Sequence, residues 1–391
     1  MESRFTPPRR LLLGPGPSDA HPRVLAALGQ PLIGHLDPAF LALMDDVKRM
    51  LRAVFRTRNE LTFAVSGTGS AGMEACLVNL LEEGDEAVVM VNGEFGRRMT
   101  DIVERCRARL VAHEIPWGRA VEPDDVAQAI AKARQPKLVA MVHAETSTGA
   151  QSPIAEIAPI VARSGALFVV DTVTSLGGCP VEVDGWGIDA CYSGTQKCLS
   201  CPPGLSPLTF GERALEALRR RRSKVQSWYL DLTMIEKYWG VERVYHHTAP
   251  ISMSYALAEA LRVVEEEGLE ARFDRHRRNH LALAAGLEAL GFRFVVEPDR
   301  RLWMLNSVYL PTLASGRDEA QLRRRLLDDF SIEVGGGLGA FKGKIWRIGL
   351  MGESSRRVNV MRLLEALEVL LPDVGVRLRA GASLAAAEAC A

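Results

Sequence analysis

The sequence predicts an α/β protein in which a large domain with a mostly parallel β-sheet precedes a smaller α+β domain. Through the first half of the chain, short apolar runs rich in β-branched residues alternate with segments of helical pattern. Such alternation is typical of βαβ units, whose helices cover both faces of a parallel sheet. After about residue 250, two long amphipathic helices and then shorter elements replace this alternation. With 391 residues, the chain is long enough for two domains.

The large domain is expected over 21–265, after an N-terminal arm over 1–20. The arm carries four prolines, which favour an extended chain over a regular element. Near-continuous apolar runs predict buried strands at 61–65, 87–91, 138–143, 167–171, 189–193 and 208–210. The segments between them have a helical pattern at 71–81, 97–107, 123–132 and 153–163.

The small domain is expected over 266–391. Amphipathic helices at 252–266 and 269–290 lead into it. It then continues with an apolar run at 307–310, a helix at 318–328, a glycine-rich turn at 335–339, a strand at 345–348 and a helix at 358–370. The Ala-rich tail at 380–391 favours a helical or frayed end.

Charge and composition argue against several classes of protein. Basic and acidic residues both number 48, so the formal net charge is zero and gives no electrostatic case for a nucleic acid or a membrane surface. No stretch approaches the about 18 apolar residues of a spanning helix. The N-terminus also has no apolar run of signal-peptide length, so a cytoplasmic protein is expected.

The seven cysteines, an odd number, favour free thiols in a reducing compartment over a disulfide framework. Cys198 and Cys201 form a lone C-x-x-C close to Cys191. A structural zinc site needs four ligands, and no second pair stands at a suitable spacing, so no metal is expected. The role of these three thiols stays open.

Gly67, Gly69 and Gly72 match the pattern G-x-G-x-x-G between a predicted strand and a predicted helix. Glycines let the backbone approach an oxyanion, and the helix N-terminus offers free N–H groups and a favourable dipole. Hydroxyl donors are added by Ser66, Thr68 and Ser70. A dinucleotide site would also need an acid after the next strand, where Glu94 stands. This stretch alone leaves open a dinucleotide, another phosphate, or a turn that only caps the helix.

Two residues further along the chain favour a different phosphate. Asp171 ends a buried strand, where open α/β sheets bind ligands, and Lys197 follows the next strand among small residues. Alone, each has a plainer explanation, a capping Asp and a surface Lys. With the glycine-rich loop they form the set that pyridoxal phosphate requires: an amine to join it, a carboxylate to keep its ring nitrogen protonated, and a phosphate site. Gly72 is then expected to be a packing residue, and Glu94 loses its ribose role.

Eight motifs follow one another along nearly the whole chain. They are LLLGPGPSDAHPRV (11–24), IGHLDPAF (33–40), SGTGSAGMEA (66–75), HAETSTG (143–149), VVDTVTSLGG (169–178), YSGTQKCLSCPPG (192–204), YHHTAP (245–250) and GGGLGAFKGKIWRIG (335–349). Each alone has weak to moderate specificity, but their order and spacing are specific. The sequence resembles the fold-type I, class V pyridoxal-phosphate aminotransferases, and within them the alanine–glyoxylate and serine–glyoxylate enzymes.

The resemblance implies roles in cofactor binding. Lys197 would be the Schiff-base lysine, and Asp171 would pair with the pyridine nitrogen. The remaining contacts would come from Thr68, Gly69, Ser70 and Gln196 at the phosphate, Thr146 at the ring hydroxyl, and Phe95 stacked on the ring.

The resemblance also implies how substrate and subunits meet. Arg347 would clamp the substrate carboxylate, and the turn at Gly34 would line the substrate entrance. Tyr245 and Thr248 would reach the phosphate of the neighbouring subunit's cofactor, so the active unit would be a homodimer with shared active sites.

Two positions depart from the glyoxylate enzymes of this family. Phe95 stands where they carry Trp, and it stacks with less area and no indole N–H. Ser70 stands where they can carry His. Both changes loosen the substrate assignment and leave the chemistry intact.

The implied activity moves the amino group of L-alanine or L-serine to glyoxylate, giving glycine and pyruvate or hydroxypyruvate. A pyridoxamine–pyruvate or aminoethylphosphonate aminotransferase is the alternative. A cysteine desulfurase would need a nucleophilic Cys in the second half, yet no Cys lies between Cys201 and Cys390. An NAD-dependent dehydrogenase is more distant, because it leaves Lys197 and YHHTAP unexplained. The preferred donor, the direction and the pathway stay open.

Overall fold

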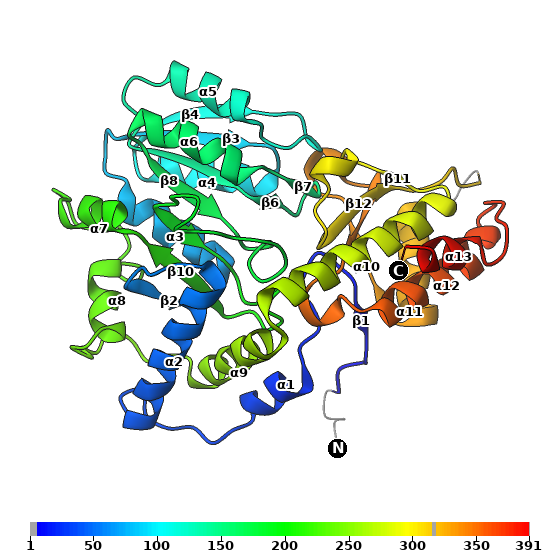
Figure 1. The fold of residues 1–391 in the computed structure, drawn as a ribbon, viewed down its shortest axis with the longest axis horizontal. Helices are drawn as coiled ribbons and strands as arrows, with labels where there is room; N and C mark the ends of the chain where they lie inside the picture. Colours follow the sequence, from blue (N-terminus) through cyan, green and yellow to red (C-terminus); the bar gives the residue numbers. More distant parts are fainter. Residues whose placement is uncertain (1–5, 315–317, 391) are drawn as a thin grey trace.

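A large lobe and a smaller lobe make up the computed structural model, which describes residues 6–314 and 318–390. The large lobe holds a seven-stranded sheet and the smaller lobe a four-stranded sheet. The long consecutive helices α9 (Ile251–Glu267) and α10 (Leu269–Ala289) connect the large lobe to the smaller lobe (Figure 1). The α/β class predicted from the sequence is confirmed.

The large sheet contains β2 (Leu61–Ser66), β3 (Glu86–Val91), β4 (Arg109–Glu114), β5 (Leu138–Val142), β8 (Leu167–Asp171), β9 (Ala190–Tyr192) and β10 (Leu205–Phe210). Its order is β2-β10-β9-β8-β5-β3-β4. The pairs from β9 to β4 are parallel, whereas β10 is antiparallel to both β2 and β9. Strands β3, β5 and β8 are buried along their whole length, as helices on both faces require. The sheet is therefore mostly parallel, as predicted.

The helices of the large lobe are α1 (Pro22–Leu28), α2 (Pro38–Phe55), α3 (Gly69–Leu80), α4 (Glu94–Arg105), α5 (Pro123–Lys132), α6 (Ile154–Ser164), α7 (Glu212–Arg219) and α8 (Leu232–Trp239). Helices α3 and α4 pack against each other, as do α5 and α6. The predicted helix at 123–132 has the bounds of α5, and the other three predicted helices correspond to α3, α4 and α6 within a few residues. The pattern of alternating strands and helices located these elements correctly.

Several elements lie where none was predicted, among them α2 and β4. One side of α2 is buried in the large core, including Phe40, Met44 and Leu51. β4 pairs only with β3 at the edge of the sheet, and its residues are exposed or half-buried. An edge strand of this kind lacks the continuous apolar run that marks the buried strands.

The smaller lobe packs helices on an antiparallel sheet of order β11-β12-β15-β14. Its strands are β11 (Arg293–Phe294), β12 (Leu305–Tyr309), β14 (Gly335–Gly336) and β15 (Ile345–Gly349). Its helices are α10, α11 (Glu319–Phe330), α12 (Arg357–Asp373) and α13 (Ala382–Glu388), with 3-10 turns at Pro298–Arg300, Gly339–Phe341 and Gly352–Ser354. The glycine-rich turn predicted at 335–339 thus includes a short strand. The Ala-rich tail predicted at 380–391 is helical from Ala382 to Glu388. Residue 391 lies outside the described residues.

The division between 265 and 266 stays a prediction. It falls near the end of α9, which packs against α1 and α2 of the large lobe. Helix α10 packs instead against α12 and α13.

The N-terminal arm crosses both lobes. Its short strand β1 (Leu11–Leu12) pairs in parallel with β13 (Ile332–Glu333) of the small lobe. The backbone N–H of Ser18 then donates to the carbonyl of Gln196 in the large lobe, over 2.9 Å. A hairpin of β6 (Ala144–Glu145) and β7 (Ala150–Gln151) follows β5. Residues 1–5 of the predicted arm lie outside the described residues.

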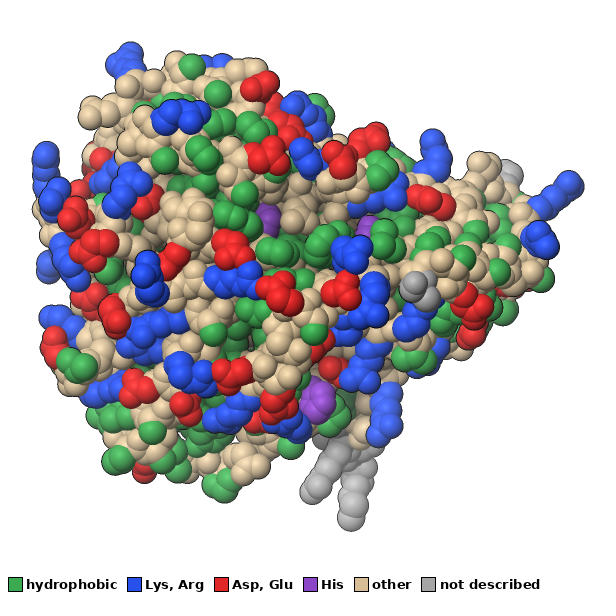
Figure 2. Space-filling view, in the orientation of Figure 1, with side chains coloured by type: hydrophobic (Ala, Val, Ile, Leu, Met, Phe, Trp, Pro, Cys, Tyr) green, Lys and Arg blue, Asp and Glu red, His purple; other side chains and the backbone are tan. Residues whose placement is uncertain are grey.

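Charged residues of both signs are interspersed over the face drawn in Figure 2, in keeping with the balanced composition. Among the described helices, none is at once long enough and apolar enough to cross a membrane.

Candidate active site

The glycine-rich stretch after β2 forms the N-terminus of α3. Gly67 has a φ of +143°, and a Cβ there would lie 2.6 Å from the Cβ of Ala71, so this turn requires glycine. Thr68 is the N-cap and makes no side-chain cap hydrogen bond. An anion at this helix end would meet backbone N–H groups, the positive end of the dipole and the exposed hydroxyls of Thr68 and Ser70.

Asp171 ends β8 as a buried carboxylate. The Tyr192 hydroxyl donates to its Oδ2 over 2.7 Å, and the Val173 N–H donates to its Oδ1 over 2.8 Å. Burial raises the pKa of Asp171 to about 7 against these two hydrogen bonds, and the carboxylate of Glu145 adds to the rise. A cationic partner at this carboxylate would restore its ionised form.

Lys197 lies in the turn after β9 and is enclosed by the protein. Burial lowers the pKa of Lys197 to about 8, and the positive charge of Arg347 adds to this lowering. Its Nζ donates to the carbonyl oxygen of Pro15 in the N-terminal arm. A Cβ at Gly16 would lie 2.7 Å from the same Nζ. An amine with a lowered pKa is an effective nucleophile and proton carrier near neutral pH.

Two glycines bring the helix end and the lysine turn together. A Cβ at Gly69 would lie 3.0 Å from Val173, in the loop after β8. A Cβ at Gly194 would lie 3.4 Å from the Cα of Gly69 and 2.9 Å from the Oε1 of Gln196. The start of α3 can therefore approach the ends of β8 and β9, so the glycine-rich loop, Asp171 and Lys197 converge as predicted.

Glu145, directly before Thr146, is fully buried and holds the start of α4, where Phe95 lies. Glu145 Oε2 accepts the N–H of Phe95 over 3.2 Å, and its Oε1 accepts the Ser147 hydroxyl over 2.6 Å. A Cβ at Gly93 would lie 2.5 Å from the Glu145 side chain, so the start of α4 packs directly on β6. Burial raises the pKa of Glu145, although the hydrogen bonds from Ser147 and Phe95 oppose the rise.

Arg347 points from β15 of the small lobe toward the same region. Its Nη1 donates to the Thr146 carbonyl over 3.2 Å and its Nε to the Gly336 carbonyl over 2.8 Å. Burial lowers the pKa of Arg347 to about 10, and the Glu145 carboxylate opposes that change. Its Nη2 has no hydrogen-bond partner among the described residues, which leaves one donor edge for a carboxylate.

These residues fit pyridoxal phosphate. The site offers an enclosed amine, a buried carboxylate that lacks a cationic partner within bonding range, and a helix N-terminus without a side-chain cap. In addition, the Oε1 of Gln196 is buried and has no hydrogen-bond partner among the residues that the structure describes. A phosphorylated, cationic heterocycle bearing an aldehyde would satisfy these groups together.

Three predicted residues are not enclosed in the single chain. Gly34, Tyr245 and Thr248 are exposed on the surface of the single chain. The Tyr245 ring lies 5.1 Å from the ring of His35, centroid to centroid, so this tyrosine and the turn at Gly34 share one surface.

Glu145 and Tyr192 are site residues to which the sequence assigned no role, although both lie in the quoted motifs. The parallel register of β8 and β9 sets Tyr192 beside Asp171, and strand register is not readable from apolar runs. Two other expectations agree with the structure. A Cβ at Gly72 would lie 2.1 Å from the Ser206 hydroxyl, so Gly72 is a packing residue. The second concerns the helix predicted at 97–107, which begins at Glu94 as α4, and Glu94 pairs with Arg98 at 3.7 Å.

All seven cysteines are free. Burial raises the pKa values of Cys191, Cys198 and Cys201 to about 12, so these thiols stay protonated near neutral pH.

Comparisons with known proteins point to one family of enzymes. Residues 20–337 match the family model described as aminotransferase class-V. A (S)-ureidoglycine–glyoxylate transaminase of Bacillus subtilis is 40% identical over 97% of this chain and 95% of its own. An alanine–glyoxylate aminotransferase of Rattus norvegicus is 41% identical over 93% of this chain and 88% of its own. A solved structure of alanine–glyoxylate aminotransferase from Nostoc sp. is 49% identical, covers 95% of this chain and 97% of its own, and has a TM-score of 0.92.

Proposed function

The chain belongs to the class V aminotransferases, and from that premise we propose that it moves the amino group of L-alanine or L-serine to glyoxylate. The products would be glycine and pyruvate or hydroxypyruvate. The observation that carries the proposal is the convergence of an enclosed amine, Lys197, with a guanidinium, Arg347, that has one edge free. An α-amino acid has a carboxylate that the guanidinium would bind and an amine that would take the place of the lysine amine.

The cofactor would be pyridoxal phosphate, as the family implies. Lys197 would hold its aldehyde carbon, Asp171 its ring nitrogen and Thr146 its ring hydroxyl, while Phe95 would stack on the ring. The phosphate would be held by Thr68, Gly69, Ser70 and Gln196. When bound, the cofactor supplies an electron-accepting ring that stabilises negative charge at the substrate α-carbon.

The chain's own residues would then carry out three tasks. Burial lowers the pKa of Lys197 to about 8, so its Nζ would take up the α-proton of the substrate. It would then deliver this proton to the C4′ carbon of the cofactor. Arg347 would bind the substrate carboxylate through its free edge and fix which bond of the α-carbon faces the lysine. Asp171 would stay ionised against the cationic ring.

A homodimer is the proposed active unit. Trp228 is 61% exposed, Tyr245 56% and Val241 98%, which is unusual exposure for large apolar side chains close together in sequence. Thr248 is exposed beside them, and Gly34 lies near Tyr245. A second copy of the chain would cover this surface, and Tyr245 and Thr248 would reach the phosphate of its cofactor.

The cytoplasm is the proposed location. Six of the seven free cysteines are buried, and a chain that keeps so many unpaired thiols suits a reducing compartment.

The donor has a second candidate, (S)-ureidoglycine, because the Bacillus subtilis relative carries that name. Glyoxylate stands in the names of the three relatives described above, which supports it as the acceptor.

A donor and acceptor panel tests the proposal. The holoenzyme would be assayed with L-alanine, L-serine or (S)-ureidoglycine and glyoxylate, and kcat/KM compared. Alanine or serine is expected to be the best donor, and Lys197→Ala, the matched inactive control, should give no glycine. Preference for ureidoglycine would move the donor assignment, whereas activity only with pyridoxamine and pyruvate, or only with a phosphonate amine, would overturn the proposal.

A further inference from the structure

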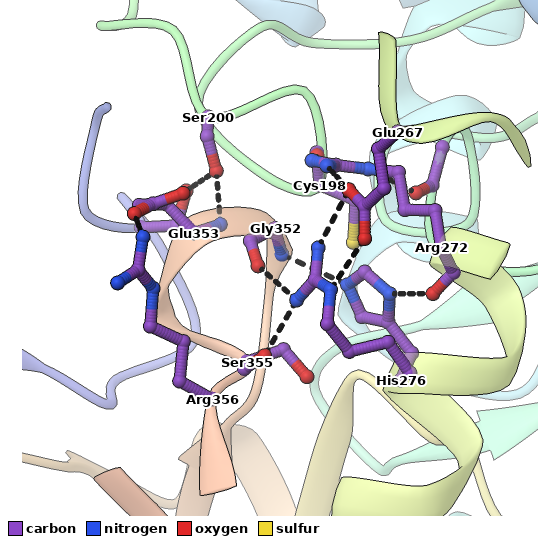
Figure 3. A network of polar contacts seen from close by, with 12 residues as sticks. Cys198, Ser200, Glu267, Arg272, His276, Gly352, Glu353, Ser355 and Arg356 are labelled. Atoms are coloured by element: carbon purple, nitrogen blue, oxygen red, sulfur yellow. Dashed lines mark hydrogen bonds and ion pairs between the residues drawn. The ribbon is translucent and has the colours of Figure 1, made fainter. Parts of the chain in front are cut away.

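Arg272, on the first turns of α10, is a buried guanidinium that the proposed chemistry does not use. It is 2% exposed. Its Nε donates to the carbonyl of Gly177 over 3.0 Å and its Nη2 to the carbonyl of Cys198 over 2.6 Å. Its Nη1 pairs with Glu267 Oε2 at 2.5 Å (Figure 3). Every nitrogen of the fork therefore has a partner.

The two carbonyls belong to the segments that carry the reacting groups. Cys198 directly follows Lys197, and Gly177 lies in the loop that leaves β8 after Asp171. The lysine turn contains no helix or strand of its own that would fix it. Hydrogen bonds from a charged donor are among the strongest available to a carbonyl. The Cys198–Leu199 peptide, one residue beyond Lys197, is thus hydrogen-bonded to α10.

The charge of this fork is secured by Glu267. Burial disfavours the ionised carboxyl, but Arg275 and Arg272 outweigh it and hold the pKa of Glu267 at about 2. An ionised Glu267 keeps Arg272 charged although burial lowers the pKa of that guanidinium.

Arg275 forms a second arm of the network, which reaches the turn after β15. Its Nε pairs with Glu267 Oε1 at 2.5 Å, and its Nη1 donates to the carbonyl of Gly352 over 2.9 Å. The N–H of Gly352 donates to His276 Nε2 over 2.9 Å (Figure 3). Gly352 lies just after β15, the strand of Arg347. Glu267 therefore joins an arm on the lysine turn to an arm on the small lobe.

We propose that Arg272 is a positioning residue for Lys197. It holds the turn that follows the lysine, so that Nζ lies where the cofactor aldehyde would bind. The inference rests on the proposed function. It predicts that loss of Arg272 weakens the bond between lysine and cofactor without weakening the phosphate site, which lies on α3.

Two forms of the cofactor separate these effects. The aldehyde of pyridoxal phosphate can form a carbon–nitrogen double bond with the lysine amine, and its oxygen leaves as water. Pyridoxamine phosphate has no aldehyde and binds only through non-covalent contacts. For the apoprotein of Arg272→Met, we expect the Kd of pyridoxal phosphate to rise about tenfold, equivalent to about 1.4 kcal/mol. The Kd of pyridoxamine phosphate should stay within about twofold of wild type. Arg272→Lys, which keeps a charged donor, should restore part of the lost affinity.

Arg275→Met is the matched control, because it removes a guanidinium from the same carboxylate but contacts the small lobe. It should leave the ratio of the two Kd values unchanged, as should the exposed Arg278→Gln. If Arg272→Met does not fold, Glu267→Gln replaces it, with a smaller effect in the same direction.

Unchanged Kd values in Arg272→Met, or an equal loss for both compounds, would overturn the inference, the second because it indicates general damage to the site. A wild-type protein that binds neither compound would instead contradict the proposed function, and the inference with it.

Discussion

Asp171 and Lys197 are the residues whose chemistry depends most on burial. Without a cofactor, burial raises the pKa of Asp171 to about 7 and lowers that of Lys197 to about 8. Each shift disfavours the charged form of the group, and a cationic ring would later stabilise the charged form of Asp171. The apoprotein therefore holds these groups at a cost in stability that ligand binding relieves.

Asp171→Asn should stabilise the apoprotein, and only at the upper end of the pH range. The folded pKa of about 7 lies above the ordinary value of 3.8, so between these values the folded state holds a proton that the unfolded state has lost. Stability therefore falls as pH rises through this window, and the full cost is present above it. Thermal or urea unfolding should show a gain of a few kcal/mol for the variant at about pH 8 and none at about pH 4.

Asp184→Asn is the control for that measurement. Asp184 accepts hydrogen bonds from the Thr57 hydroxyl and the Arg58 N–H, so its replacement should cost stability at both pH values. An Asp171→Asn variant that is no more stable than wild type at about pH 8 would refute the burial account.

The site residues divide into those with a chemical signature in sequence and those without one. Asp171 and Lys197 could be predicted because their residue types after buried strands match a known chemistry, and Arg347 because the family resemblance implies its role. Glu145 and Tyr192 could not be given roles, because their parts depend on strand register and on the approach of α4 to β6. Such contacts are long-range, and local periodicity carries no information about them.

At the scale of elements, buried strands were predictable and half-exposed elements were not. Strands such as β8 have an uninterrupted apolar run, which fixes their location within about one residue. β4 and the helices α7 and α8 mix apolar and charged residues, and tertiary packing decides their form. The pairing of β1 with β13 joins segments at opposite ends of the chain, which no local pattern indicates.

Gly72→Ala tests how α3 is seated on the sheet. A Cβ there would lie 2.1 Å from the Ser206 hydroxyl and 3.1 Å from the Tyr192 Cβ, so α3 would have to move away from β9 and β10. We expect a loss of about 1–3 kcal/mol in the free energy of unfolding, as for other overpacked positions. Cofactor affinity should fall as well, because the same helix carries the phosphate contacts.

Gly29→Ala is the matched control for this substitution. A Cβ at Gly29 would meet only the Ala26 carbonyl, at 3.6 Å, and its φ of −90° suits any residue. A Gly72→Ala protein as stable as Gly29→Ala would contradict the packing role.

At the scale of the whole molecule, the single chain exposes large apolar side chains that a partner could cover. Trp228 stacks on His246 with ring centroids 4.6 Å apart and is still largely exposed, and Tyr229 and Tyr245 lie in the same part of the chain. The residues predicted to complete a neighbour's site, Tyr245 and Thr248, are exposed in the same part of the chain. The homodimer stays a prediction.

Trp228→Asp should shift the protein from dimer to monomer. A charge at the centre of a buried interface is unpaired and costs several kcal/mol. Val369→Asp is the control, because Val369 on α12 has a similar exposed fraction, 59% against 61%, but lies in the small lobe. Sedimentation velocity would measure both, and a Trp228→Asp protein that sediments like wild type would contradict the proposed interface.

Lys197 and its neighbours are proposed to form a site for amino transfer. The sharpest test is the half-reaction with the amino donor alone. The holoenzyme would be mixed with L-alanine, without any acceptor, and the pyruvate released would be counted. We predict about one pyruvate per subunit, because without an acceptor each site would have room for the amino group of one donor only. Adding glyoxylate should then release an equal amount of glycine. Absence of pyruvate with every amino acid tried, or equal release by Lys197→Ala, would contradict the account.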